Sequence, residues 1–192
     1  MTLKRAVECV IGRIGTATAL IMWIALGTAS VSAEDTRLPQ REGPPVQTTP
    51  DIPHVQLGVQ PVPEVRTELL RRVRSLPGLE IRPTIIGMWG TDGFWLRDDK
   101  LEHANEIFRG REFAHLHPDG SLHASLPPGR ALEAIDAGWA TAHPSAQFHA
   151  RLAGFVMLFS PRNEDEAEVT FGLIVDAYNH FTGKNLIAAD FP

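Results

Sequence analysis

Alternating apolar and polar residues over Arg111–Ser125 (REFAHLHPDGSLHAS) predict a β-hairpin, and the rest of the chain is interpreted around it. Its turn is Pro118–Gly120: proline suits the second position of a type I turn, and glycine suits the left-handed residue that follows. A three-residue loop places His115 opposite His123. A two-residue loop would mix the two faces, so we expect the longer loop.

This register sorts the hairpin into one apolar face and one polar face that carries three imidazoles. The apolar face comprises Ala114, Leu116, Leu122, Ala124 and Leu126, and the polar face comprises His115, His117, Ser121, His123 and Ser125. A directly opposed cross-strand pair has its Cβ atoms about 5 Å apart. The polar face is therefore the candidate functional site.

Two helices are predicted where apolar residues recur at helical spacing. The first is Pro63–Leu76, with proline at its start and a Pro-Gly pair after it. The second, Pro127–Ala137, has Leu132 and Ile135 as its expected apolar side. The segment that follows, Gly138–Pro144, is expected to be a loop.

A third, longer helix is expected near the C-terminus. It begins within 161–166, where an acidic first turn suits the helix dipole, and Gly183 ends it. Either Ser160 or Asn163 can cap it. Its core-facing stripe consists of Ala167, Phe171, Ile174, Tyr178 and Phe181.

Three further strands are indicated. Gly154–Ser160 is an unbroken apolar run, as expected of a central strand, and Gly93–Arg97 is a short candidate. Glu80–Met88 contains Pro83, which places it at a sheet edge or delays its start. Residues 98–110 fit either a short helix or a loop. This order of elements predicts an α+β two-layer domain: a mostly antiparallel sheet with a His-rich hairpin and helices packed on one face.

The chain begins with a predicted export signal over residues 1–33. A basic start precedes the apolar run 14–29, and Val31–Ala33 is a small-residue cleavage site. The mature chain would then be periplasmic or secreted; if the signal is not cleaved, residues 14–31 would anchor it in a membrane. A proline-rich linker over 34–63 and a domain over 64–190 follow.

Charge and cysteine content narrow the classes of function. The formal net charge is −5, and the signal holds three of the basic residues, so the remainder is more acidic. Such a chain is a poor nucleic-acid binder, and a small molecule is the expected partner. The one cysteine, Cys9, lies in the signal, which excludes a disulfide or a thiol nucleophile from the mature chain.

The histidine face supports two kinds of chemistry. Imidazoles act as general bases or as donors to developing negative charge, and we expect His115, His117, His123 and His143 to be catalytic. His115, His117 and His123 also form a candidate three-nitrogen site for a transition metal such as zinc or iron. A solvated polar surface is the remaining interpretation.

Several separated motifs, taken together, resemble the luciferase domain of fungal bioluminescence over about residues 111–182. They are His115–His117, Ser121–His123, Gly138-Trp139 with His143-Pro144, and Leu158–Glu166. The Pro118–Gly120 turn is shorter than the corresponding fungal stretch, and the region before Arg111 matches poorly. The family enzyme adds molecular oxygen to a hydroxylated α-pyrone (3-hydroxyhispidin) without an organic cofactor, and an endoperoxide-type intermediate loses carbon dioxide and emits light.

The resemblance implies an oxygenase, cofactor-independent or metal-assisted, acting on an electron-rich pyrone- or phenol-like molecule. His115 or His123 would deprotonate it, and His117 or His143 would stabilise peroxide charge. Ser121, Asp119 and two aromatic residues, Trp139 and Trp95, are the expected substrate contacts. A non-catalytic envelope protein that binds a small molecule or metal, and a His-dependent hydrolase, are the alternatives.

Overall fold

The computed structural model describes residues 37–97 and 101–192 and contains one six-stranded antiparallel sheet. The predicted export signal lies outside these residues. The strands follow the order β1-β2-β3-β4-β6-β5. Their bounds are β1 Leu79–Pro83, β2 Asp92–Leu96, β3 Glu112–Leu116, β4 Leu122–Ser125, β5 Ala140–Ala142 and β6 Phe155–Leu158.

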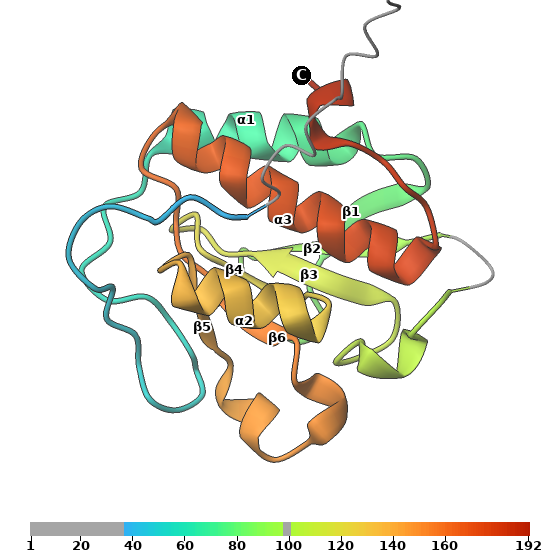
Figure 1. The fold of residues 1–192 in the computed structure, drawn as a ribbon, viewed down its shortest axis with the longest axis horizontal. Helices are drawn as coiled ribbons and strands as arrows, with labels where there is room; N and C mark the ends of the chain where they lie inside the picture. Colours follow the sequence, from blue (N-terminus) through green and yellow to red (C-terminus); the bar gives the residue numbers. More distant parts are fainter. Residues whose placement is uncertain (1–36, 98–100) are drawn as a thin grey trace, which may run out of the picture. The chain divides into compact units, whose positions relative to one another are not determined.

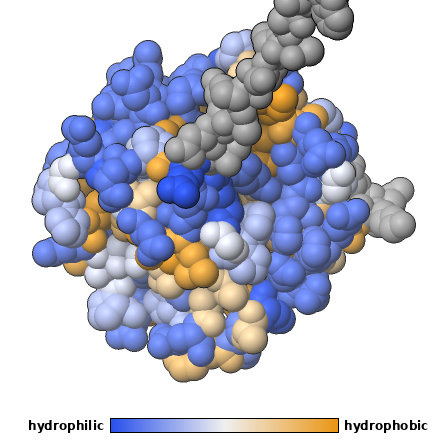
Figure 2. Space-filling model, viewed as in Figure 1, coloured by the Kyte–Doolittle hydropathy of each residue, from blue (hydrophilic) through white to orange (hydrophobic). Residues whose placement is uncertain are grey.

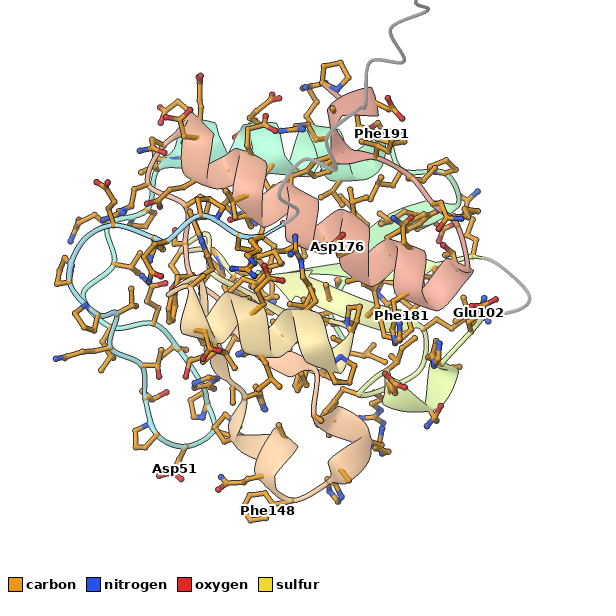
Figure 3. All side chains as sticks on the ribbon, in the orientation of Figure 1. Asp51, Glu102, Phe148, Asp176, Phe181 and Phe191 are labelled. Carbon is orange, nitrogen blue, oxygen red and sulfur yellow. The ribbon has the colours of Figure 1, made fainter. Side chains whose placement is uncertain are left out.

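Three helices lie over one face of this sheet (Figure 1): α1 Pro63–Arg74, α2 Pro128–Asp136 and α3 Glu164–Thr182. The outer side of this layer is mostly hydrophilic (Figure 2), because the apolar sides of the helices point toward the sheet. Asp176 on α3 accepts a 2.7 Å hydrogen bond from Arg130 on α2, which joins two of the helices (Figure 3). The predicted α+β class is confirmed.

The hairpin has the predicted register. His115 pairs with His123 and Leu116 with Leu122, and the glycine of the turn, Gly120, adopts φ +87°. The apolar face packs under the helices, where Ala114, Leu116, Leu122 and Ala124 are each at most 1% exposed. The histidine face therefore lies on the side of the sheet that the helices leave uncovered.

A β-bulge alters the upstream end of β3. The pairing of β2 with β3 shifts between Phe94 and Trp95, so Trp95 opposes Glu112 and Phe113 has no partner in the register. A bulge re-aims the side chains next to it. Phe113 thereby enters the core, and the carboxylate of Glu112 reaches the histidine face instead.

The predicted long helix is confirmed in detail. Asn163 caps α3 by accepting a hydrogen bond from the backbone N–H of Glu166, and Gly183 ends it with φ +65°. Every residue of the predicted stripe is buried. β6 lies between β4 and β5, so the apolar run 154–160 does supply an interior strand.

Three local expectations differ from the structure. The second helix does not bury Leu132, which is 63% exposed; it packs through Ala131 and Ala134, whose small side chains let the helix approach the sheet closely. Residues 138–144 are not wholly a loop, because Ala140–Ala142 pairs with β6 as the edge strand β5. The strand predicted over 80–88 ends at Pro83, where the missing N–H stops the ladder.

The proline-rich segment 37–61, expected to be a linker, packs along the domain. Arg41 forms a buried 2.9 Å ion pair with Glu166 on α3, and its guanidinium also donates to the carbonyl of Ser160 at 3.0 Å. The indole N–H of Trp139 donates to the carbonyl of Pro39 at 2.6 Å. Within the described parts of the chain, no helix has the length and apolar character needed to span a membrane.

Candidate functional site

The histidine face forms the floor of a cavity of about 310 Å³. Its polar lining consists of five imidazoles: His54, His115, His117, His123 and His143. Each is buried. Apolar walls surround them, formed mainly by Ile52, Ile86, Met88, Phe108 and Phe155. A volume of this size is at the small end of ligand pockets, so it suits a small molecule.

The imidazoles come from four separate parts of the chain. His115 lies on β3, His117 directly follows the end of that strand, and His123 faces His115 from β4. His143 follows β5, at the start of a short 3-10 turn. His54 belongs to the proline-rich segment, and its ring stacks on that of His123 with centroids 5.3 Å apart. Only the three histidines of the hairpin are brought together by local strand pairing. His54 and His143 reach the site from other segments.

Three of the rings are linked in a chain of close nitrogen contacts. Nε2 of His115 lies 3.0 Å from Nδ1 of His123, and Nε2 of His123 lies 3.2 Å from Nδ1 of His54. Nε2 of His54 in turn lies 3.3 Å from the hydroxyl of Thr48. Each nitrogen pair needs one donor and one acceptor, so the tautomers along this chain are coupled.

His117 has its tautomer set by a local relay. Its Nδ1 lies 2.9 Å from the hydroxyl of Ser121, and that hydroxyl donates to Oδ1 of Asp119 at 2.7 Å. A carboxylate oxygen accepts here, so the Ser121 hydroxyl donates its hydrogen bond to Asp119. The same hydroxyl then accepts a hydrogen bond from His117. His117 therefore carries its proton on Nδ1, and Nε2 presents a lone pair.

His143 has the opposite tautomer. Its Nδ1 accepts a 3.0 Å hydrogen bond from the backbone N–H of Ser145, so a neutral ring must carry its proton on Nε2. Its ring meets that of His123 edge-on, with centroids 4.6 Å apart. The hydrogen-bond donor of the neutral His143 ring is thus its Nε2–H.

Glu112 is a buried carboxylate beside the cluster, and its side chain has no solvent exposure. It accepts hydrogen bonds from Thr84 Oγ1 at 2.5 Å and from the N–H of Ile85 at 2.9 Å. Nδ1 of His115 lies 3.1 Å from its Oε1, an ion-pair distance, although the angle falls short of a hydrogen bond. Glu112 is the acidic group nearest that otherwise unpartnered nitrogen.

Burial favours the neutral form of four of the five imidazoles. Desolvation, followed by the charges of neighbouring imidazoles, lowers the pKa of His117 and of His143 to about 4. The same two causes hold the pKa of His123 well below its usual value, and desolvation also lowers the pKa of His54. Neutral imidazole is a weak base here, and it is the form that binds metals.

Two groups of cavity histidines have ligand atoms close enough to hold a metal ion. They are His115 with His117 and His123, and His54 with His123 and His143; within each group these atoms lie within 4.8 Å of one another. A third group, His103, Glu106 and His180, lies outside the cavity and is partly exposed. The donor chemistry of the cavity thus fits a transition metal.

The structure brings the four predicted catalytic histidines together, and Asp119 and Ser121 reach the site through His117. Trp139 and Trp95 are not among the residues that line the cavity. Trp139 is buried in the core beside Arg41, and Trp95 stacks with Arg82. Phenylalanine and aliphatic side chains form the walls instead.

Sequence reasoning did not find His54 or Glu112. Nothing near His54 in the sequence marks it, because its role depends on how a remote segment packs. Strict alternation along β3 puts Glu112 on the apolar face, and only the bulge turns it to the histidines. The two nearby signals, an acidic residue in a strand and a glycine in the neighbouring strand, are each too common to be specific.

A family model described as Luciferase domain matches residues 110–177. No curated protein and no solved structure matches the chain. The matched range includes the hairpin, His143 and most of α3, so it holds four of the five cavity histidines. The resemblance of this chain to the luciferase domain is thus confirmed for residues 110–177.

Proposed function

We propose that this chain is an exported, luciferase-like oxidoreductase that adds molecular oxygen to a small, flat, electron-rich molecule of the pyrone or phenol class. The observation that carries the proposal is the cavity itself. Four of its five imidazoles lie in the region matched by the luciferase domain, and it combines apolar walls with a floor of imidazoles. The apolar walls favour a flat ring, and the imidazoles favour an acidic O–H group on it.

The reaction needs the substrate as an anion. Loss of the O–H proton leaves an electron-rich ring carbon, which supplies the electron pair for a new C–O bond and reduces oxygen to a peroxide. The proton then returns to the distal peroxide oxygen, so the product is a substrate hydroperoxide that retains both oxygen atoms. The Nε2–H of His143 is placed to stabilise negative charge on that peroxide.

Two forms of this proposal differ in how the anion arises. A histidine acting alone is a poor base, because the low pKa of His117 makes proton transfer from an enol or phenol unfavourable. A metal ion on the imidazole floor would supply Lewis-acid stabilisation of the bound anion. The neutral cluster therefore favours the metal-assisted form.

Oxygen uptake by the purified full chain, measured with a panel of hydroxylated pyrones and phenols, tests the proposal. We expect uptake with at least one compound, no uptake by His123→Ala, and unchanged uptake by His149→Ala, whose exposed imidazole lies outside the cavity. Circular dichroism of both variants controls for folding. Normal uptake by folded His123→Ala would refute the proposal.

The same assay addresses two other functions. Saturable ligand binding with no oxygen uptake and no product would identify a non-catalytic binding protein. A hydrolysis product formed without oxygen uptake would identify a hydrolase that uses the same cluster. Either result would overturn the oxygenase proposal.

A further inference from the structure

We propose that Nε2 of His115, Nε2 of His117 and Nδ1 of His123 bind one divalent transition-metal ion, with His54 as the outer partner that orients His123. This inference rests on the proposed function for the role of the metal, but its evidence is the geometry of the cluster. It assigns the ligand atoms and gives the proline-rich segment a part in the site.

The three ligand atoms converge because of the strand register. His115 and His117 are two residues apart in extended chain, at and just after the end of β3, so their side chains point to the same face, and His123 lies directly opposite His115 on β4. Nε2 of His115 and Nδ1 of His123 are 3.0 Å apart. Two ligands on a tetrahedral zinc ion at about 2.0–2.1 Å are about 3.4 Å apart, so the pair needs to separate by only a few tenths of an ångström.

Each of the three rings has a polar partner for its other nitrogen. Nδ1 of His115 faces the buried carboxylate of Glu112, and Nδ1 of His117 donates to Ser121. The remaining nitrogen of His123, Nε2, lies 3.2 Å from His54. Partners of this kind fix the tautomer and orientation of metal-binding histidines, and a carboxylate beside an imidazole is the commonest form.

Metal binding requires a tautomer change that the chain of contacts permits. Without metal, a proton must sit between Nε2 of His115 and Nδ1 of His123. With metal in its place, His123 carries its proton on Nε2 and donates it to Nδ1 of His54. His54 then carries its own proton on Nε2 and donates it to Thr48, so no nitrogen loses its partner.

The other histidine groups fit a metal less well. In the group of His54, His123 and His143, Nδ1 of His143 already accepts from Ser145, so its Nε2 carries a proton and cannot ligate. In the group outside the cavity, the side chain of His103 is 49% exposed and its imidazole faces Glu106. His143 and His180 therefore supply matched control positions.

Three imidazoles suit zinc, iron or copper, and they leave a fourth coordination position open. The apolar cavity lies above the cluster, and His143, whose neutral ring carries its proton on Nε2, also lines it. A substrate oxygen at the open position would therefore meet both the metal and a hydrogen-bond donor. This arrangement matches what oxygenation of an enol or phenol requires.

The test is metal content, measured with the full chain carrying His180→Gln so that the partly exposed group does not contribute. After loading with Zn²⁺ and removal of free metal, we expect about one equivalent, retained by added His143→Phe and lost with added His117→Gln. Glu112→Gln keeps the size but removes the charge, and it should weaken Zn²⁺ binding about 10- to 100-fold in a chelator competition.

Undiminished zinc content in the folded His117→Gln chain, or equal loss in His143→Phe, would overturn the assignment. Oxygen uptake separates this inference from the proposed function. One equivalent of zinc, iron or copper with no uptake of oxygen would support the metal site and refute the oxygenase. Full uptake by chelator-treated chain of verified zero metal content would support the oxygenase and refute the role of the metal in it.

Discussion

His115 and His123 face each other across the hairpin with Nε2 and Nδ1 only 3.0 Å apart, and neither ring is more than 5% exposed. A contact this short needs one donor and one acceptor, so only one of these two nitrogens carries a hydrogen there. The strand register thus couples the tautomers of the two rings as well as setting their positions.

Replacing Ser121 with alanine should allow His117 to adopt both neutral tautomers. The variant removes the hydroxyl that accepts the Nδ1 proton and that bonds Asp119, which leaves a buried donor unsatisfied. We expect a loss of about 1–3 kcal/mol in the free energy of unfolding. The ¹⁵N shifts of His117 should change from the pure Nδ1–H form to a mixture of both tautomers.

Ser125→Ala is the matched control on the same face of the hairpin. The hydroxyl of Ser125 is buried but has no hydrogen-bond partner, so its removal should be neutral or slightly stabilising. An equal loss of stability in the two serine variants, with unchanged His117 shifts, would show that the relay from Asp119 does not exist.

Replacing Gly93 with alanine should displace the carboxylate of Glu112. A Cβ at Gly93 would lie 2.8 Å from Nε1 of Trp95 and 3.0 Å from Cδ of Glu112, so at least one of them must move. We expect a destabilisation of about 1–3 kcal/mol, the usual cost of overpacking. Urea unfolding measures it, and the imidazole signals of His115 report the altered contact.

The same substitution at Gly129 should have the opposite effect on stability. Gly129 lies in α2, and a Cβ there meets nothing within 4 Å. Alanine at this sterically open position in the first turn should therefore stabilise the chain by about 0.4–1 kcal/mol. Similar effects of the two glycine variants would contradict the close approach of β2 to Glu112.

Acidification should destabilise the metal-free chain between about pH 6.5 and pH 4. The pKa of His117 and of His143 is lowered to about 4 in the folded state, so between these values the unfolded state binds more protons. Stability then rises with pH through this window and is lost as pH falls. A shift of this size corresponds to roughly 3 kcal/mol for one histidine.

Urea midpoints measured at several pH values, after chelator treatment, test this dependence. His143→Phe removes one of the titrating groups, so its stability should fall less steeply on acidification than that of the unchanged protein. If the stability of the unchanged protein did not vary from pH 7 to pH 4.5, the pKa values of these histidines would not be lowered by folding, and the cluster would be accessible to water.

Arg41→Ala should loosen the segment that carries His54. Arg41 is 5% exposed and pairs with the buried carboxylate of Glu166, so its removal leaves that carboxylate to Arg162 alone. Breaking a buried pair costs about 3–5 kcal/mol, and the remaining partner should keep the loss near the lower value. Limited proteolysis should then cut within 37–61 faster than in the unchanged protein.

Arg71→Ala is the control for this experiment. Its ion pair with Glu68 is about half exposed, and exposed pairs contribute about 0–1 kcal/mol. We expect almost unchanged thermal unfolding and unchanged proteolysis at 37–61. If both arginine variants behaved alike, the proline-rich segment would not be held by its buried ion pair.

The sequence by itself determined the elements whose signals are local. Alternation and the Pro-Asp-Gly turn determined the hairpin register, because a slip of one residue exchanges its two faces. Helical spacing with an acidic first turn and a terminal glycine determined α3. The register in turn placed His115, His117 and His123 on one face, since side-chain direction in a strand depends only on position along it.

Only the tertiary structure decided the rest of the site. His54 enters through a segment held by the contact of Arg41 with Glu166, more than a hundred residues away in the chain. Glu112 enters through a bulge that depends on pairing with β2. Leu132 is exposed because the small residues of α2 pack closely on the sheet. Such outcomes follow from which segments meet in space, and no local pattern of hydrophobicity encodes that choice.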